Sequence, residues 1–236
     1  MTFTKGFKDG IPIGLGYLSV SFTFGMMAAR AGLTIAQAVF ISMTNVTSAG
    51  QLAGLNLIAA GAPMLEVALT QFIINLRYAL MSLSLSQKLD GSMTTPHRML
   101  FAFCNTDEVF AVAAGQKGSV GRRYLYGLIA APYIGWALGT CLGAAAGTLL
   151  PDILRDALGV AIYAMFIAIV VPPAKHSRAV RLAVVLAAAL SCAMYYLPGL
   201  NRISSGFAII ICAVAVSALC ARLFPIPESD EEEDAA

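Results

Sequence analysis

Charged residues are scarce in this sequence. Only 12% of its 236 residues are Asp, Glu, Lys or Arg, whereas 58% are hydrophobic. A soluble domain carries about 25% charged residues on its water-facing surface. The shortage excludes an ordinary soluble enzyme, a disordered chain and a coiled coil. A polytopic membrane protein remains, because lipid then covers the apolar exterior.

The sequence also lacks the motifs of common enzymes and metal sites. It contains no G-x-x-x-x-G-K-[ST] loop, no H-E-x-x-H pair and no G-x-S-x-G elbow. Its two histidines, His97 and His176, lie between apolar segments. The cysteines show no C-x-x-C spacing and are interpreted as packing residues. They are Cys104, Cys141, Cys192, Cys212 and Cys220. We therefore expect no enzymatic activity, no metal and no cofactor.

Long apolar runs predict the membrane segments, since a spanning helix needs about 20 apolar residues. The segments lie near residues 11–30, 35–60, 64–87, 99–116, 124–149, 155–172, 180–198 and 203–222. The fourth and sixth are short, which is typical of half-helices or re-entrant segments. The sequence thus predicts an all-α polytopic membrane protein with about seven or eight transmembrane helices. A faint similarity of residues 24–43 to 138–165 leaves open two related halves, as in many transporters.

Lysine and arginine predict the orientation, because they concentrate in cytoplasmic loops. Their clusters are Lys5 and Lys8, then Lys117, Arg122 and Arg123, then Lys175, Arg178 and Arg181. All three clusters are cytoplasmic if both termini are cytoplasmic. The loop 88–98 then lies outside, and its Lys88 and Arg98 conflict with the rule. We expect one transmembrane domain, residues 1–223, followed by a disordered acidic tail, residues 224–236. The first apolar run is longer than that of a signal peptide, so no cleavage is expected.

Ionisable residues inside predicted segments are the first candidates for function, since each costs about 2.5–3.5 kcal/mol at a helix centre. Glu66 follows Pro63 and is interpreted as an interfacial acid at a helix N-terminus. Arg77 lies deeper and needs a carboxylate partner. Asp107 and Glu108 differ by about 100° around a helix, so one can pair with Arg77 while the other faces a cavity and carries a proton. A static ion pair is the alternative interpretation.

The second segment has a polar, glycine-containing middle. Its polar residues and glycine are Ser42, Thr44, Asn45, Thr47, Ser48, Gly50 and Gln51. A helix broken at mid-membrane exposes backbone groups that can hold the charged ends of an amino acid. Alternatively, these side chains bond back onto their own helix. The candidate substrate-binding residues are Asn45, Ser48, Gly50, Gln51 and Asn75.

A stripe of glycines marks the fifth segment. Gly135, Gly139, Gly143 and Gly147 recur every four residues and therefore share one helix face. Such a face lets two helices approach closely. The stripe indicates either tight packing inside this chain or a seam for a partner subunit or a second copy.

A series of short motifs resembles the AzlC family, the large subunits of branched-chain amino acid exporters. The motifs are Phe7-x-x-Gly10-x-Pro12, Phe24-Gly25, Ala31-Gly32-Leu33, Ser48-Ala49-Gly50-Gln51, Asn75-Leu76-Arg77-Tyr78 and Thr106-Asp107-Glu108. They occur in the order of the family, and the similarity in length and segment pattern covers nearly the whole chain. The last two motifs are the most specific.

The resemblance implies export of Leu, Ile, Val and often Met across a bacterial cytoplasmic, or inner, membrane. It also implies a small AzlD-like membrane subunit and energy from the proton gradient. On this hypothesis Gln51, with a break at Ser48–Gly50, helps to hold the zwitterion. The coupling network comprises Glu66, Asn75, Arg77, Thr106, Asp107 and Glu108.

Other functions stay open at this stage. The chain could be an uncoupled channel or facilitator for small amphipathic solutes, or a membrane scaffold that transports nothing. The basic residues are scattered between apolar runs, so nucleic acid is not an expected partner. The lipid bilayer and an amino acid substrate are the expected partners beside the small subunit, and a second copy of the chain is a further alternative.

Overall fold

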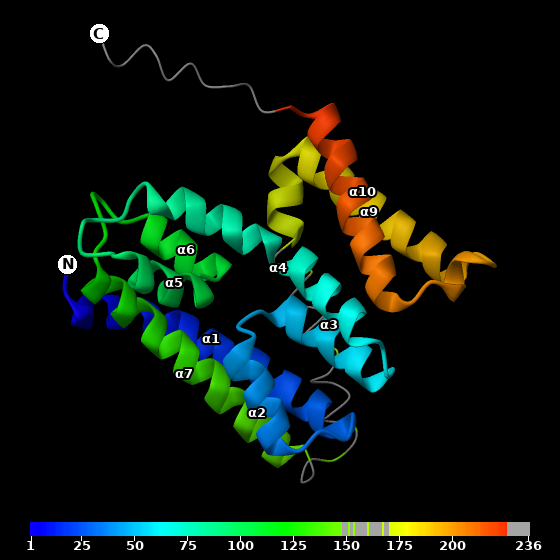
Figure 1. The fold of residues 1–236 in the computed structure, drawn as a ribbon, viewed down its shortest axis with the longest axis horizontal. Coiled ribbons are helices and arrows are strands. Elements are labelled where there is room, and N and C mark those ends of the chain that lie inside the picture. The colour runs from blue at the N-terminus through cyan, green and yellow to red at the C-terminus, as the bar shows by residue number, and fades with distance from the viewer. Residues whose placement is uncertain (148–150, 152, 154–159, 161–166, 168–169, 226–236) are drawn as a thin grey trace. The chain divides into compact units, whose positions relative to one another are not determined.

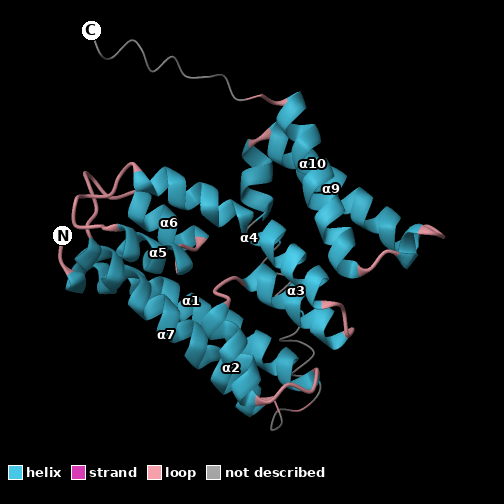
Figure 2. Ribbon diagram, in the orientation of Figure 1, coloured by secondary structure: helices cyan, strands magenta, loops and turns pink. Residues whose placement is uncertain are grey.

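The computed structural model describes residues 1–147, 151, 153, 160, 167 and 170–225, and in these residues it contains helices and no strands (Figures 1 and 2). This confirms the all-α polytopic class. Within the described residues, 5 helices are long and apolar enough to cross a membrane. They are α1 (Phe3–Arg30), α4 (Met64–Ser86), α7 (Arg122–Ala146), α9 (Arg178–Tyr196) and α10 (Ser205–Leu223). The chain forms two compact units, Met1–Ala164 and Met165–Ala236.

Helices α1 and α7 lie side by side along their length (Figure 1). The glycine stripe of α7 faces α1. A Cβ atom on any of three stripe glycines would collide with α1 backbone. The colliding pairs are Gly135 with Gly14, Gly139 with Leu18 and Gly143 with Phe22. The residue numbers rise together along both helices, so α1 and α7 run parallel. The structure therefore assigns these three glycines to packing inside the chain and not to a seam for another subunit.

This packing predicts that Gly143→Ala destabilises the protein. The new methyl group would meet the backbone of Phe22, which cannot rotate away. We expect a loss of about 1–3 kcal/mol in the free energy of unfolding, seen as a lower melting temperature in detergent. Gly16→Ala is the matched control, because a Cβ at Gly16 on α1 meets nothing within 4 Å. Equal melting temperatures for the two variants would contradict the packing described.

The second and fourth predicted segments are each a pair of short helices. The first pair is α2 (Ile35–Thr44) and α3 (Ser48–Ala59), and the second is α5 (Thr95–Phe103) and α6 (Asp107–Ala114). The first break was predicted at Ser48–Gly50 but lies at residues 45–47. Its position follows from Thr47, whose side chain accepts a hydrogen bond from the Gly50 N–H and so caps α3. Ser48–Gly50 therefore forms the first turn of α3.

Helices α5 and α6 begin and end at the same end of the long helices. The loop before α5 and the loop after α6 hydrogen-bond to each other, with Asp90 N–H donating to Val120 C=O (3.0 Å) and Val120 N–H to Lys88 C=O (2.9 Å). The N-terminus joins them, since Lys5 Nζ donates to Gln116 Oε1 at 2.8 Å. The prediction that loop 88–98 lies across the membrane from Lys117 is therefore wrong. Helices α5 and α6 are each only about 13 Å long. The chain therefore turns back at the break between them, near mid-depth.

Polar residues of this loop have local partners. Lys88 Nζ donates to the carbonyl of Ala114 in the last turn of α6, where a cation complements the helix dipole. The Ser92 hydroxyl and N–H donate to the Asp90 carboxylate and lower its pKa. The stabilisation from these bonds is thus present at neutral pH and is lost as the pH falls through that lowered pKa.

Helices α2 and α3 form the other broken pair, which lies at the opposite end of the long helices from α5 and α6. Helix α2 starts just after α1 ends, and α3 leads through residues 60–63 into α4. The last residues of α4 lie at the end of the long helices where the chain's N-terminus lies, which we call the N-terminal end. This pair therefore begins and ends at the far end of the long helices. The last turn of α2, just before the break, reaches the middle of α7, where the Tyr133 hydroxyl donates to the Met43 carbonyl at 3.0 Å. Two re-entrant pairs thus meet near mid-depth from opposite ends.

The arrangement shows an internal repeat that differs from the one inferred from sequence. A long helix followed by a broken pair occurs twice, as α1–α2–α3 and as α4–α5–α6 in the inverted direction. Both breaks contain an Asn and then a Thr at the position just before the next helix, namely Asn45 with Thr47 and Asn105 with Thr106. Inverted repeats of this kind place binding sites near mid-membrane in transporters. The similarity of 24–43 to 138–165 lies partly outside the described residues.

The second unit contains a helical hairpin. Helices α9 and α10 pack together and are joined through a 3₁₀ turn, η1 (Leu200–Arg202). Cys212 Sγ lies 3.7 Å from Met194 Sδ between them, which agrees with the predicted packing role of this cysteine. Most of the predicted segment at 155–172, and the acidic tail from residue 226, lie outside the described residues.

Candidate functional site

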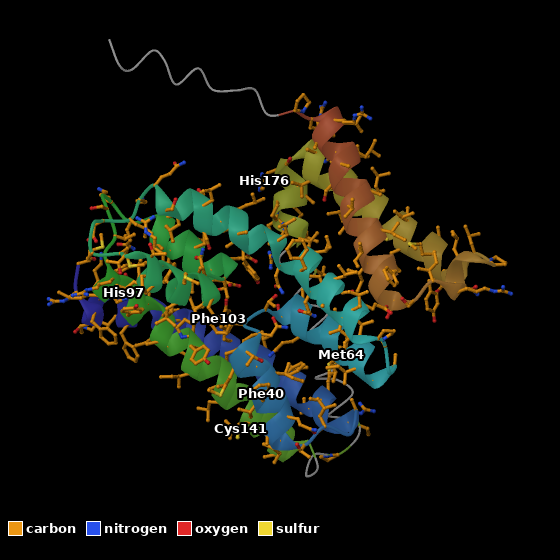
Figure 3. All side chains as sticks on the ribbon, in the orientation of Figure 1. Phe40, Met64, His97, Phe103, Cys141 and His176 are labelled. Carbon is orange, nitrogen blue, oxygen red and sulfur yellow. The ribbon has the colours of Figure 1, made fainter. Side chains whose placement is uncertain are left out.

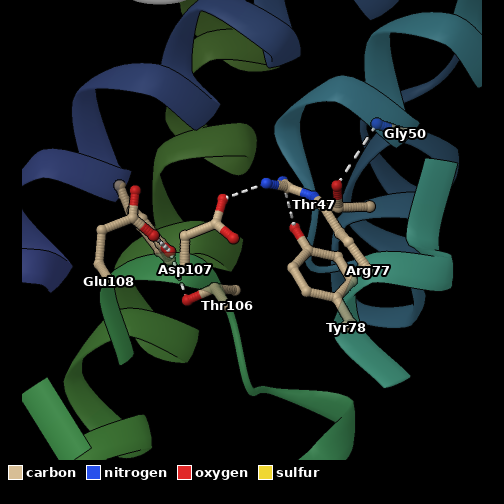
Figure 4. Close-up of polar contacts among 8 residues, drawn as sticks. Thr47, Gly50, Arg77, Tyr78, Thr106, Asp107 and Glu108 are labelled. Carbon is tan, nitrogen blue, oxygen red and sulfur yellow. Dashed lines mark hydrogen bonds and ion pairs between the residues drawn. The ribbon is translucent and has the colours of Figure 1, made fainter. Parts of the chain in front are cut away.

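A cavity of about 270 Å³ lies where the two helix breaks meet α4. Its lining comes from both breaks, from the ends of α2 and α5 and from the middle of α4. The lining residues are Thr44, Asn45, Val46, Thr47, Asn75, Tyr78, Ala102, Phe103, Asn105 and Thr106. Figure 4 shows several of them at close range, and Figure 3 labels Phe103, which is 46% exposed. We call this space the central cavity.

One wall of the central cavity is a hydrogen-bonded set of amides. Asn45 Nδ2 donates to Gln71 Oε1 (3.0 Å), and Gln71 Nε2 donates to the Gly50 carbonyl (2.8 Å). Asn75 Nδ2 also points to Gln71 Oε1, while its own Oδ1 is buried and accepts no hydrogen bond within the described residues. The predicted Asn45 and Asn75 are therefore brought together. Gln71 was not predicted, although it lies one helical turn before Asn75.

The predicted ion pair is confirmed. Arg77 Nη1 on α4 lies 2.5 Å from Asp107 Oδ2 at the start of α6 (Figure 4). The second guanidinium nitrogen donates to the Tyr78 hydroxyl at 3.1 Å, and the guanidinium carbon lies 4.8 Å from the centre of that ring. Tyr78 itself lines the central cavity, so the pair lies directly behind the cavity wall.

Glu108 faces the other way from Asp107, as the 100° argument predicts. The Tyr17 hydroxyl on α1 donates to the Glu108 carboxylate and lies 2.6 Å from Thr106 Oγ1, and Thr106 lines the central cavity. Among the described residues no cation pairs with Glu108. Tyr17 was missed at the sequence level. Its signal was a phenol in the middle of an apolar run.

Three predicted residues lie elsewhere. Gln51 is only 1% exposed, and its Nε2 donates to Ser42 Oγ (2.6 Å), so it ties α3 to α2. Ser48 does not line the central cavity, and Glu66 is buried in the first turn of α4, at the far end. The position of Glu66 agrees with its interpretation as an acid at a helix N-terminus. Gly50 accepts the hydrogen bond from Gln71 through its carbonyl and donates its N–H to Thr47 Oγ1.

Comparison with known proteins identifies the family. A family model described as AzlC protein matches residues 12–150. The chain belongs to the AzlC family. The matched range contains both helix breaks, the Arg77–Asp107 pair and Glu108. All residues that line the central cavity therefore lie in the part of the chain that matches the AzlC family model. Among the described residues, no cluster of three or more His, Cys, Asp or Glu could hold a metal ion.

Curated relatives are membrane proteins. The chain is 29% identical to the inner membrane protein YgaZ of Escherichia coli over 80% of each chain. It is 36% identical to an uncharacterized membrane protein of Archaeoglobus fulgidus, over 75% of this chain and 79% of that protein. A second uncharacterized membrane protein, from Helicobacter pylori, is 30% identical over 62% of this chain. No solved structure matches the chain. These likenesses support a membrane protein of a transporter-type family.

Proposed function

We propose that this AzlC protein is the large subunit of a secondary transporter that exports Leu, Ile, Val and Met across the bacterial cytoplasmic membrane. We further propose that it is proton-coupled and acts with a small AzlD-like membrane subunit. The observation that carries the proposal is the central cavity itself. Its 270 Å³ is somewhat below the roughly 300–1,000 Å³ of pockets for drug-sized ligands, which suits a small solute.

The lining of the central cavity matches an aliphatic zwitterion. Asn75 Oδ1 is a buried acceptor that an ammonium group would satisfy. The Thr106 hydroxyl in the lining accepts a hydrogen bond from Tyr17, so its own hydrogen can be donated to a carboxylate. Val46, Ala102 and Phe103 supply apolar walls. One methylene changes binding by only about 1–3 kcal/mol, so overlap among the four substrates is expected.

The two acids suggest different roles in coupling. Asp107 is held by Arg77, and loss of its charge would leave a cation uncompensated. Within the part of the chain that the structure describes, Glu108 has only the Tyr17 hydroxyl as its hydrogen-bond partner, so we propose that it gains and loses a proton without breaking an ion pair. Thr106 and Tyr17 connect Glu108 to the cavity wall. We therefore propose Glu108 as the proton carrier and the Arg77–Asp107 pair as the support of the site.

The charge distribution supports a cytoplasmic N-terminus. The basic residues of the first unit at the N-terminal end are Lys5, Lys8, Lys88, Arg98, Lys117, Arg122 and Arg123. At the far end the described residues include Arg30. Moving loop 88–98 to the N-terminal end removes the one conflict with the positive-inside rule. Because both the second and fourth segments turn back, the number of crossings changes by an even number, and the C-terminus stays cytoplasmic in this proposal.

Exposed charged and apolar side chains on α4 support the proposal of a small partner subunit. Arg77 and Asp107 are 49% and 43% exposed in this chain alone, and a charged pair facing lipid is costly. Helix α4 also presents a row of exposed apolar side chains: Leu65, Leu69, Phe72, Leu76, Leu80 and Leu83. A helical partner covering α4 would remove both the pair and this row from lipid.

Efflux from preloaded cells tests the proposal. Efflux of labelled Leu, Ile, Val and Met is measured in cells that lack their own exporters. The cells carry either this chain alone or this chain together with its small genomic neighbour. Cells with both chains are also measured in the presence of an uncoupler. We expect efflux that needs both chains and stops with the uncoupler. Efflux that continues in the uncoupler would favour the facilitator. No efflux of any of the four, with the protein present in the membrane, would refute the proposed substrates.

A further inference from the structure

A second cavity, of about 230 Å³, lies between α4 and α5. Its lining residues are Ser82, Leu85, Ser86, Leu89, Arg98, Met99, Phe101, Ala102 and Asn105. It extends from the helix break at Asn105 to the end of α4 and the start of α5, which lie at the N-terminal end. Ala102 and Asn105 also line the central cavity, so these two residues separate the two spaces.

Asn105 lies between the two cavities and belongs to the lining of both. It is only 2% exposed, and its Nδ2 donates to Ser82 Oγ of α4 at 3.0 Å. Its Oδ1 is buried and accepts no hydrogen bond within the described residues. A buried acceptor without a donor is costly, so this atom favours a passing ammonium group or water. The residue sits in the break, where no regular helix fixes the backbone.

The chemistry of the second cavity changes along its length. Leu85, Met99 and Phe101 make its walls mainly apolar, which suits an aliphatic side chain. Arg98 lies at its outer end, where its Nε donates to the Met93 carbonyl at 2.8 Å. The guanidinium can attract a carboxylate to the mouth. A cation at the mouth followed by apolar walls suits an amino acid that enters the cavity with its carboxylate first.

We propose that the second cavity is the route by which the amino acid reaches the central cavity from the N-terminal end. The Asn105–Ser82 contact closes this route between transport steps. The inference rests on the proposed export of amino acids, because it names the path to the same site. It assigns Ser86 to the wall of a water-accessible route and leaves Ser84, two residues earlier on α4, on the outer face.

Thiol modification from the cytoplasmic side tests the route. Ser86→Cys and Ser84→Cys are each made in a chain whose own cysteines are replaced by serine, and each is expressed with the small subunit. Inside-out vesicles receive a membrane-impermeant methanethiosulfonate reagent, with and without leucine. We expect Ser86→Cys to react at least about tenfold faster than Ser84→Cys, since thiolates form readily only in water. We also expect leucine to slow the reaction and the modification to block leucine transport.

The outcomes separate the route from the function. Equal reaction rates for the two variants, or full modification of Ser86→Cys with unchanged leucine transport, would overturn the route. If the unmodified protein moves none of the four amino acids, the proposed function fails. The ratio of the two reaction rates then still decides whether the second cavity opens to water at this end.

Discussion

Asp107→Asn is expected to abolish amino acid efflux while the protein still reaches the membrane. The neutral amide keeps the shape of the side chain but leaves the Arg77 guanidinium without its carboxylate, 2.5 Å away in the native protein. An uncompensated charge at a helix centre costs about 2.5–3.5 kcal/mol, so the occupancy of the native arrangement should fall roughly 60- to 300-fold. Initial rates of leucine efflux, normalised to the amount of protein in the membrane, measure the effect.

A double variant separates charge balance from a direct role in transport. Arg77→Gln combined with Asp107→Asn removes both charges and leaves nothing uncompensated. We expect it to regain the melting temperature that Asp107→Asn loses, yet to remain inactive, because the cavity wall at Tyr78 loses its guanidinium support. Normal efflux from the double variant would mean that the pair is merely structural. Normal efflux from Asp107→Asn alone would contradict the assignment altogether.

Glu108→Gln is expected to separate transport from the proton gradient. The amide cannot release a proton, although it can still accept the hydrogen bond from Tyr17. Efflux of leucine against its gradient should therefore be lost. Exchange of internal for external leucine, which needs no net proton movement, should persist. The measurement is the ratio of uphill efflux to exchange in vesicles with an imposed pH gradient.

Tyr17→Phe is the matched control for Glu108. It removes the hydroxyl that contacts both Glu108 and Thr106 but leaves the carboxylate in place. We expect this variant to keep uphill, uncoupler-sensitive efflux. Uphill, uncoupler-sensitive efflux by Glu108→Gln would show that another group carries the proton.

The charged part of the site could be predicted from the sequence because a charged side chain inside the membrane needs a partner of opposite charge. A deep arginine needs a carboxylate, and Asp107 and Glu108 were the deep candidates. The angle between adjacent helical residues then required the two acids to face different ways. The Arg77–Asp107 pair and the contact of Glu108 with Tyr17 follow this reasoning. The polar middle of the second segment likewise predicted a broken helix.

The direction in which each broken helix leaves the membrane could not be predicted from hydropathy. Residues 99–116 have the apolar length of a short crossing, yet they turn back because the loops at 87–94 and 115–121 pair through backbone bonds that any sequence can make. Gln51 illustrates a second limit. It shares a polar segment with Asn45, but helix α3 turns it toward Ser42 and away from the central cavity. Side-chain direction there depends on where the break falls, and a shift of two residues reverses it.

The central claim is that the cavity between the two helix breaks holds the amino acid. Equilibrium binding of labelled leucine to the purified complex tests it most directly, with Asn75→Leu as the variant and Ser84→Ala, on the outer face of α4, as the control. Leucine keeps the branching at Cγ and the number of side-chain heavy atoms of asparagine but lacks the buried Oδ1 acceptor. We predict saturable binding by the native protein and by Ser84→Ala, and at least about tenfold weaker binding by Asn75→Leu, the effect of one lost hydrogen bond to a charged group. Equal affinity of Asn75→Leu and the native protein would contradict the account.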